Sequence, residues 1–354
     1  MSSSLGNKLK VQLFGQSHSR AVGVVMDGLP AGEKIDMQRV GEFLQRRAGG
    51  KAWSTRRTEP DVPNIVGGLV DDVTCGAPLC ALFENTNTAS ADYEELRAVP
   101  RPSHADYTAF VKHSAHNDMN GGGHFSARLT LPLCFAGAVC LQLLERKSVA
   151  IDAHIHSIGD IVDEPFNALC ANDAPVGRDF PVLSSAVGEK MIGAIEAAAA
   201  DGDSLGGVVE CGVWGLPVGL GEPIFDNLES CLSYALFAIP AVKGVEFGAG
   251  FQYAKMRGSQ SNDPFYMDNG KVRTKTNNSG GILGGISSGM PVIFRAAFKP
   301  TPSISKAQRS VNLLTGEDVT LSIKGRHDPC VVPRAVPCVI AAAAIVMLDF
   351  ILGG

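Results

Sequence analysis

Residues 132–144 read PLCFAGAVCLQLL, a run that is apolar all round when it is wound into a helix. A second run of this kind, AVPCVIAAAAIVML, covers residues 335–348. A helix without a polar face has no side to turn toward water, so we expect both runs to lie buried between other layers. Pro337 lies near the start of the second run and the charged Asp349 ends it. These two residues predict a helix that is too short to span a bilayer.

Runs that alternate between polar and apolar residues predict strands around these helices. The predicted strands cover residues 10–14, 22–26, 150–157, 208–214, 292–298 and 319–323. Asp36 is suited to cap a helix that turns Val40, Phe43 and Leu44 inward and ends at Arg46 and Arg47. Asp226 and Glu229 predict the start of a further helix through a capping box, and residues 188–200 predict another.

Two stretches share the same spacing of glycine and proline. Gly67-Gly68 precedes Gly76-Ala77-Pro78, and Gly280-Gly281 precedes Gly289-Met290-Pro291. Each stretch runs into an apolar strand and then a basic loop, Arg101-Pro102-Ser103 or Lys299-Pro300-Thr301. The pattern predicts two similar α+β halves that face each other, with both basic loops near a shared cleft. Chance similarity between glycine- and proline-rich turns is the alternative explanation.

The composition limits the classes of function. The chain has 354 residues, 45% of them hydrophobic and 6% aromatic, and a net charge of −5. This charge attracts neither nucleic acid nor an anionic membrane, and the aromatic content does not suit base stacking. Nine cysteines without a C-x-x-C pair predict free thiols in the cytoplasm, and the polar N-terminus predicts no signal peptide. We expect a single domain over residues 1–354.

Four polar clusters carry the residues suited to chemistry. They cover residues 15–19, 101–107, 121–128 and 325–330, and each lies at a predicted turn or at the end of a strand. Arginines in or beside them suit a small phosphorylated or carboxylated ligand, because guanidinium binds such groups in a bidentate manner. His18, His104 and Asp328 could transfer protons near neutral pH. Solvated surface turns are the alternative reading of each cluster taken alone.

A pair of histidines on one predicted strand, His154 and His156, resembles a metal-binding pair. No third ligand is nearby in the sequence, so a solvated strand face is the preferred interpretation and no metal is predicted.

Taken together, the motifs resemble those of the chorismate synthase family along nearly the whole chain. The matching segments are residues 14–18 (FGQSH), 27–32, 57–61, 84–86, 101–107 (RPSHADY), 121–123, 126–128, 202–207, 219–223, 241–246, 280–289, 299–303 and 325–329. The resemblance implies a carbon–oxygen lyase that forms chorismate from 5-enolpyruvylshikimate 3-phosphate by 1,4-anti elimination of phosphate. It also implies dependence on reduced FMN, an α+β sandwich with helices packed between antiparallel sheets, and a homotetramer.

The resemblance also assigns roles to residues. His18, with Ser17 beside it, would protonate the leaving phosphate, His104 would hold or protonate the flavin, and Asp328 would act with Ser126 at the flavin N5. The residues implied in substrate binding are Arg47, Arg57, Arg101 and Arg128. Those implied in cofactor binding are His124, Phe125, Ser126, Ala241, Gly284, Lys299, Pro300, Thr301, Pro302, Ser303 and Arg326.

The chain departs from the family pattern at several of these segments. His124-Phe125 stands where many members have Arg-Ser, and Asn120, Trp53, Pro240 and Ile340 replace frequent polar residues. A flavin or anion binder without turnover is therefore one alternative. A flavin-independent lyase or phosphatase that uses Ser17 and His18 is another. We expect an active, monofunctional enzyme, with NADPH only as an indirect reductant.

Overall fold

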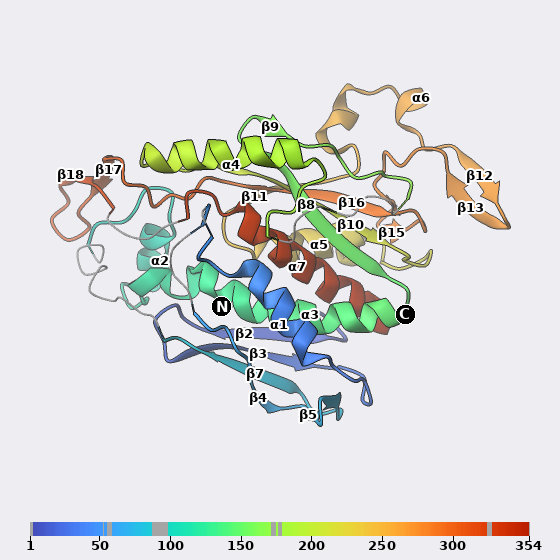
Figure 1. Cartoon of the computed structure of the whole chain (residues 1–354), viewed down its shortest axis with the longest axis horizontal. Helices are drawn as coiled ribbons and strands as arrows, with labels where there is room; N and C mark the ends of the chain where they lie inside the picture. The colour runs from blue at the N-terminus through green and yellow to red at the C-terminus, as the bar shows by residue number, and fades with distance from the viewer. Residues whose placement is uncertain are drawn as a thin grey trace.

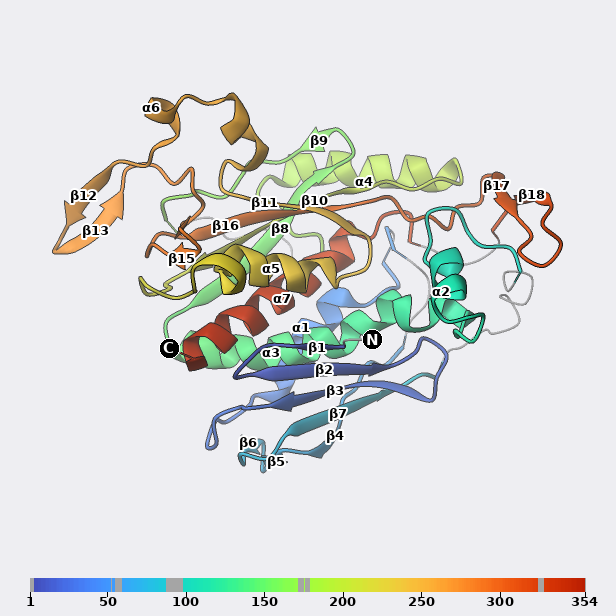
Figure 2. The same ribbon diagram turned by 180° about the vertical axis from the view of Figure 1, so that it is seen from behind.

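The computed structural model describes residues 3–51, 53–54, 59–86, 98–170, 175, 179–323 and 328–353. Two antiparallel five-stranded sheets enclose a layer of helices (Figures 1 and 2). The first sheet has the order β1 (Ser4–Leu5), β2 (Lys10–Gly15), β3 (Ala21–Asp27), β7 (Leu79–Glu84), β4 (Asn64–Gly67). The second has the order β11 (Val242–Phe247), β16 (Val292–Phe298), β10 (Gly207–Trp214), β8 (Ala150–Ile158), β9 (Ile161–Val162).

The helical layer contains the two apolar runs. They form α3 (Thr130–Arg146) and α7 (Val332–Gly353), with α1 (Met37–Arg47) and α5 (Leu228–Phe237) beside them. Helix α4 (Ser185–Ala200) packs over β8 and β9 on the outside, and α2 (Asp106–Lys112) and α6 (Gly258–Ser261) are short. The α+β sandwich with helices between antiparallel sheets is therefore confirmed.

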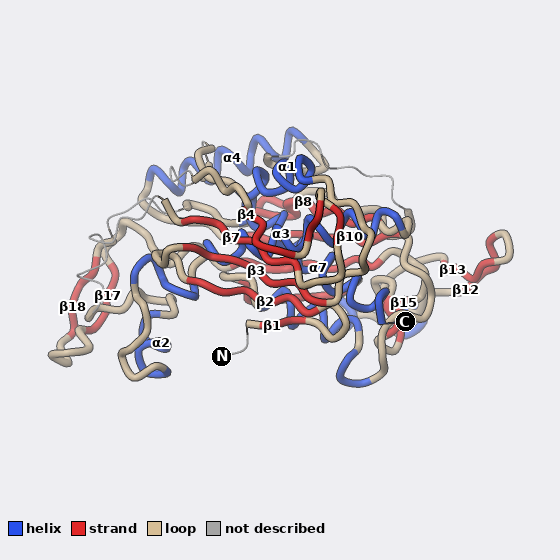
Figure 3. Tube along the Cα trace, turned by 90° about the horizontal axis from the view of Figure 1, so that it is seen from below, coloured by secondary structure: helices blue, strands red, loops and turns tan. Residues whose placement is uncertain are grey.

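In the part of the chain that the structure describes, four two-stranded hairpins extend from this body. They are β5 (Leu69–Val70) with β6 (Val73–Thr74), β12 (Phe265–Asp268) with β13 (Lys271–Thr274), β14 (Ile282–Leu283) with β15 (Ile286–Ser287), and β17 (Gln308–Val311) with β18 (Asp318–Leu321). Figure 3 shows β12–β13 projecting at one end of the molecule, and α2 and β17–β18 at the other.

Helices α3 and α7 run side by side in the same direction. The sulfur atoms of Cys134 and Cys338 lie 3.8 Å apart, and a Cβ atom on Gly137 would lie 2.3 Å from the Cα of Ala341. These contacts keep the same order along both helices, so the packing is parallel and the two N-termini lie at the same end. Glycine and alanine at the contact allow the two backbones to approach closely.

The two halves repeat the same topology. The order β2, β3, α1, β4, β7, α3 recurs as β8, β10, α5, β11, β16, α7, and the central strands are arranged in the same spatial order in both sheets. Gly28 and Gly215 occupy equivalent turns, since an added Cβ would lie 2.0 Å from the Lys8 carbonyl oxygen in one and 2.1 Å from that of Ser148 in the other. The predicted internal repeat is confirmed by this topology.

Most predicted elements are present, and three details differ. Asn227, rather than Asp226, caps α5 by accepting a hydrogen bond from the Ser230 backbone nitrogen. The strand predicted over residues 319–323 is β18, which ends at Leu321.

The third correction concerns Asp349, which does not end the last helix. Its carboxylate accepts hydrogen bonds from the backbone nitrogens of Asn7, Lys8 and Leu9 at 2.7–2.8 Å, while α7 continues to Gly353. The prediction that this run is too short for a bilayer is therefore wrong. By length and composition, segment 127–146 and α7 could each cross a membrane, but 89% and 78% of their most apolar windows are buried within the structure. Burial between the two sheets accounts for their apolar composition.

Candidate active site

Most of the predicted site residues that the structure describes gather where α3 and α7 begin. The last turn of α1 brings Arg47 to this end, and the glycine loop of residues 121–123 leads into α3. Backbone N–H groups at helix N-termini carry partial positive charge and favour anions. Two parallel helices that begin together give this end of the molecule the electrostatic character that a phosphorylated ligand needs.

The glycine loop separates two histidines. Gly121 and Gly122 have φ angles of 59° and 83°, a region that other residues seldom adopt. A Cβ atom on Gly121 would lie 2.7 Å from His18 Nε2, and one on Gly122 would lie 3.5 Å from His104 Nε2. His18 and His104 therefore lie against neighbouring residues of one loop, although 86 positions of sequence separate them.

Gly121→Ala tests this arrangement. The added methyl group would lie 2.5 Å from Ser17 Oγ and would also meet His18, at a φ angle that strains alanine. We expect kcat to fall at least about tenfold with the fold retained, because an ångström-scale displacement of a catalytic group is costly. Steady-state kinetics with Gly41→Ala as the control, where an added methyl would meet nothing within 4 Å, would check this. Equal kinetics for the two variants would contradict it.

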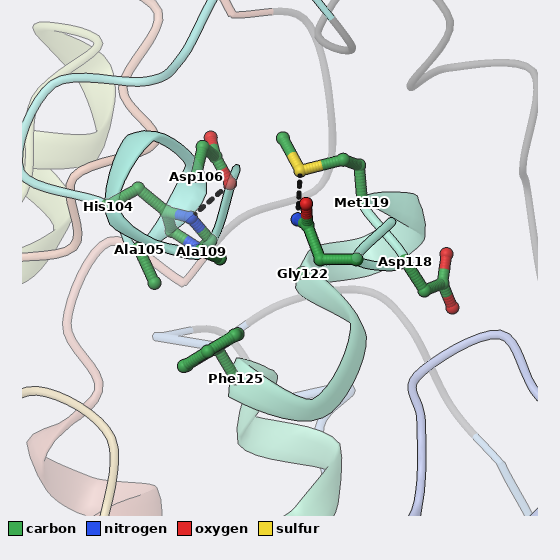
Figure 4. Close-up of a pocket in the computed structure, with 9 residues that line it drawn as sticks. His104, Ala105, Asp106, Ala109, Asp118, Met119, Gly122 and Phe125 are labelled. Atoms are coloured by element: carbon green, nitrogen blue, oxygen red, sulfur yellow. Dashed lines mark hydrogen bonds and ion pairs between the residues drawn. The ribbon is translucent and has the colours of Figure 1, made fainter. Parts of the chain in front are cut away.

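His104 is held by a buried ion pair. Its Nδ1 lies 2.5 Å from Asp106 Oδ1, and Arg101 donates to both oxygens of the same carboxylate at 2.7 and 2.8 Å. Figure 4 shows His104 and Asp106 joined in this way at a small pocket that Phe125 also lines. Because Nδ1 faces a carboxylate, we assign its proton to that contact, which leaves Nε2 toward Gly122.

The Asp106 carboxylate makes the stability of the fold depend on pH. Burial alone would raise its pKa, but hydrogen bonds from Arg101 and His104 outweigh burial and hold the pKa of Asp106 well below its ordinary value. A carboxyl group with a lowered folded-state pKa stabilises the fold above its unfolded pKa of about 4, and this contribution is lost as the pH falls.

We therefore expect urea denaturation to give a lower free energy of unfolding at about pH 3 than at pH 7. Asp106→Asn should show a smaller loss between the two conditions, because it has no carboxyl group to protonate. The same loss in both proteins would show that Asp106 does not carry this effect.

The two basic loops meet, as the repeat predicts. The ammonium group of Lys299 donates to the Ser103 carbonyl, and Arg101 donates to Ser303 Oγ at 3.4 Å. Burial, followed by repulsion from Lys243, lowers the pKa of Lys299. The Oγ1 atom of Thr301 is buried without a hydrogen-bond partner within the described residues. Two neighbouring ammonium groups and an unpartnered hydroxyl suit the binding of an anionic, oxygen-rich group.

Two of the predicted substrate-binding arginines share one buried carboxylate. Arg47 lies 3.0 Å from Asp61, and Arg128 pairs with Asp61 and with Glu59. Arg128 also donates to the Asn85 side chain at 3.0 Å. Asn85 in turn donates to the carbonyl groups of Gln16 and Ser19, next to His18. The network ties the arginines to the loop that carries His18.

Asp328 lies just before α7. Its carboxylate accepts from Arg334 at 2.5 Å, and Arg334 also donates to the Arg47 carbonyl at 2.8 Å. Asp328 is thereby joined to the arginine network. Ser126 caps the turn before α3 by accepting from the Arg128 backbone nitrogen at 3.3 Å. Arg57 and Arg326, two further predicted ligand-binding residues, lie outside the described residues.

Some predicted cofactor residues are placed differently from the rest. Gly284 lies at the β14–β15 turn near the start of α5, whereas Ala241 follows the end of this ten-residue helix, about 15 Å away along its axis. His124 has both ring nitrogens engaged, with the Gly15 carbonyl at 2.8 Å and Ser3 Oγ at 3.1 Å. The structure therefore does not bring Gly284 to the cluster and leaves His124 without a ring nitrogen to offer a ligand.

Sequence reasoning gave no role to several residues that organise the site. Asp106, Asp61, Asn85 and Arg334 each hold a predicted site residue in place. Asp106 could have been found from the spacing Arg101-x-x-His104-x-Asp106, which suits a carboxylate between two cations. Asp61 and Asn85 contact residues that are distant in the sequence, and Arg334 lies in a helix that is largely apolar, so the sequence did not indicate these three contacts.

Comparisons with known proteins agree along the whole chain. A family model described as "Chorismate synthase" matches residues 9–352. A chorismate synthase from Dehalococcoides mccartyi is 46% identical over 99% of this chain and 97% of its own length. One from Thermococcus kodakarensis is 44% identical over 98% and 97%. A solved structure described as "Crystal Structure of Chorismate Synthase" matches with a TM-score of 0.75 and 25% identity, over 98% of this chain and 93% of that one.

Proposed function

Since the chain belongs to the chorismate synthase family, we propose that the polar cluster at the start of α3 and α7 is its active site. The chain is a carbon–oxygen lyase of aromatic amino acid biosynthesis, and the reaction of its family is the elimination of phosphate that yields chorismate. The observation that carries the proposal is the placement of His18 and His104 against Gly121 and Gly122, beside arginines from three segments.

The residues at the cluster fit reduced FMN as the cofactor. Lys299 and Lys243 supply positive charge for a phosphate, and the buried Ser17 Oγ and Thr301 Oγ1 have no hydrogen-bond partner within the described residues. Gly122 leaves space beside the His104 ring, where an added Cβ would make its nearest contact at 3.4 Å. When bound, reduced FMN would supply the electron density that lets phosphate leave, which side chains do not provide.

The roles of the side chains follow from their positions. The substrate, proposed as 5-enolpyruvylshikimate 3-phosphate, carries a phosphate and two carboxylates, which suit Arg47, Arg101 and Arg128. His18 would give a proton to the phosphate as its bond to carbon breaks. His104, held at Nδ1 by Asp106, would turn Nε2 toward the flavin to donate or accept a proton there, and Asp328 with Ser126 would assist at the flavin N5.

Replacement of Lys299 tests the proposed cofactor site. We expect Lys299→Ala to weaken FMN binding in the presence of substrate by about 10- to 150-fold, the effect of losing a hydrogen bond to a charged group. Lys306→Ala is the matched control, because Lys306 is an exposed lysine paired with Asp201 and Asp203. Flavin fluorescence titration would measure both. Equal affinities would place the flavin phosphate elsewhere.

We also propose a homotetramer with one domain per chain. Exposed apolar side chains lie on two separate parts of the chain, with Val62 and Val66 at the β4 edge of the first sheet and Phe265 and Met267 on the β12–β13 hairpin. Light scattering should give four times the 37.2 kDa chain mass, and a monomer would contradict this proposal.

A cytoplasmic location and NADPH as the indirect reductant stay predictions. The nine cysteines are free thiols, as a reducing compartment requires.

A further inference from the structure

A second polar cluster lies on the outer face of the second sheet. Ala153 and Ile155 of β8 point into the core, so His154 and His156 point the other way. The strand register places His154 opposite Glu210 of β10, Glu210 opposite Arg295 of β16, and Arg295 opposite Glu246 of β11. The interpretation of His154 and His156 as a solvated strand face is wrong, because His154 and Glu210 are fully buried.

Three potential ligand atoms converge in this cluster. One atom each from His154, His156 and Glu210 lies within 4.8 Å of the others. His154 Nε2 lies 3.1 Å from Glu210 Oε2, which also accepts a hydrogen bond from the Phe166 backbone nitrogen at 2.5 Å. The other carboxylate oxygen, Oε1, is held by Arg295 at 2.8 Å. The third ligand that the sequence did not reveal is therefore Glu210, which strand pairing brings beside His154.

The surroundings of the three residues resemble the outer shell of a metal site. Asp163 Oδ2 lies 3.6 Å from His154 Nδ1, an ion-pair distance longer than a hydrogen bond, and backbone N–H groups of Leu183 and Ser184 fix the Asp163 carboxylate. A carboxylate behind a ligating imidazole orients the ring and strengthens its binding to a metal. The Nδ1 atom of His156 is buried and has no hydrogen-bond partner within the described residues.

We propose that His154, His156 and Glu210 bind a divalent transition metal of the zinc class. Two imidazoles and one carboxylate form an established ligand set for zinc, and a water molecule would complete a tetrahedral site from the side of the half-buried His156. The ion would join β8 to β10 on the face opposite α7, so the site is separate from the proposed active site. A salt-bridged row across the sheet without a bound metal is the competing explanation.

Metal binding can be tested on the whole protein without a measurement of activity. Protein freed of metals with a chelator is titrated with Zn²⁺ by calorimetry and with Co²⁺ by absorption spectroscopy. We expect one ion per chain, a tetrahedral Co²⁺ spectrum without a thiolate charge-transfer band, and a rise in Tm with Zn²⁺. Absence of one-to-one binding, or a thiolate band that assigns the ion to cysteines, would overturn the proposal.

Three variants distinguish a metal site from a set of salt-bridged side chains that binds no metal. His156→Ala should weaken binding by more than about 100-fold, and Asp163→Asn by about 10- to 100-fold. His156→Cys should bind Co²⁺ with a new thiolate band, which a purely structural histidine could not produce. His116→Ala, at an exposed histidine, is the control and should bind like wild type. Unchanged affinity in His156→Ala, or a His156→Cys spectrum without the new band, would contradict the proposal.

Discussion

Replacement of His104 with alanine is expected to lower kcat by about a hundred- to ten-thousand-fold, the usual contribution of a positioned acid or base. The imidazole is the group that Asp106 and Arg101 hold against the glycine loop, at 2.5 Å from the Asp106 carboxylate. The side chain is largely buried and its removal leaves Asp106 paired with Arg101, so the fold should persist. Steady-state release of phosphate under anaerobic conditions measures the effect.

Two further variants show whether the loss of kcat in His104→Ala comes from removal of a catalytic group rather than from a general effect of removing a histidine. His116→Ala removes an exposed histidine from the loop after α2 and should keep kcat within about twofold of wild type, as surface substitutions usually have small effects. Asp106→Asn keeps the shape but not the charge beside His104, so kcat should fall while KM changes little, because Asp106 acts through His104. A His104→Ala enzyme with wild-type kcat would remove His104 from the catalytic group.

Replacement of Arg128 with alanine is expected to cost about 3–5 kcal/mol of unfolding free energy. The guanidinium lies between Asp61 and Glu59, whose side chains are 4% and 3% exposed, and its removal leaves these buried carboxylates without one of their cations. The network also positions Asn85 and the loop of His18, so activity should fall as well. Urea denaturation measures the stability directly.

The matched control for Arg128 is Arg39, which pairs with Glu145 at the surface. Both partners are about half exposed, so Arg39→Ala should cost no more than about 1 kcal/mol. The two substitutions remove the same side chain and the same charge. Similar losses in the two variants would show that burial of the Asp61 network does not determine its contribution.

The sequence predicted the architecture well because the architecture follows from patterns visible in single segments. The two apolar runs could be buried only between layers, and they are the central helices. The matching spacing of Gly67, Pro78, Gly280 and Pro291 reflects a genuine structural repeat, since the chain must make the same turn before the same strand in both halves. Capping by Asp36 was predictable because it acts within one turn.

The features that the sequence did not predict depend on contacts between distant segments. Glu210 is a partner of His154 only because β8 and β10 pair in one register. His124 was assigned to the cofactor, yet its ring is tied to Ser3, which is 121 residues away. Arg334 directly precedes the apolar run of residues 335–348, and only packing shows that it reaches Asp328 and the Arg47 carbonyl.

The most direct test of the proposed active site is anaerobic release of phosphate from 5-enolpyruvylshikimate 3-phosphate, measured with reduced FMN, with oxidised FMN and without flavin. We predict turnover only with reduced FMN, and its loss in His104→Ala. Release of phosphate at the same rate without flavin, or undiminished turnover in His104→Ala, would contradict the proposal that this cluster holds substrate and reduced flavin together.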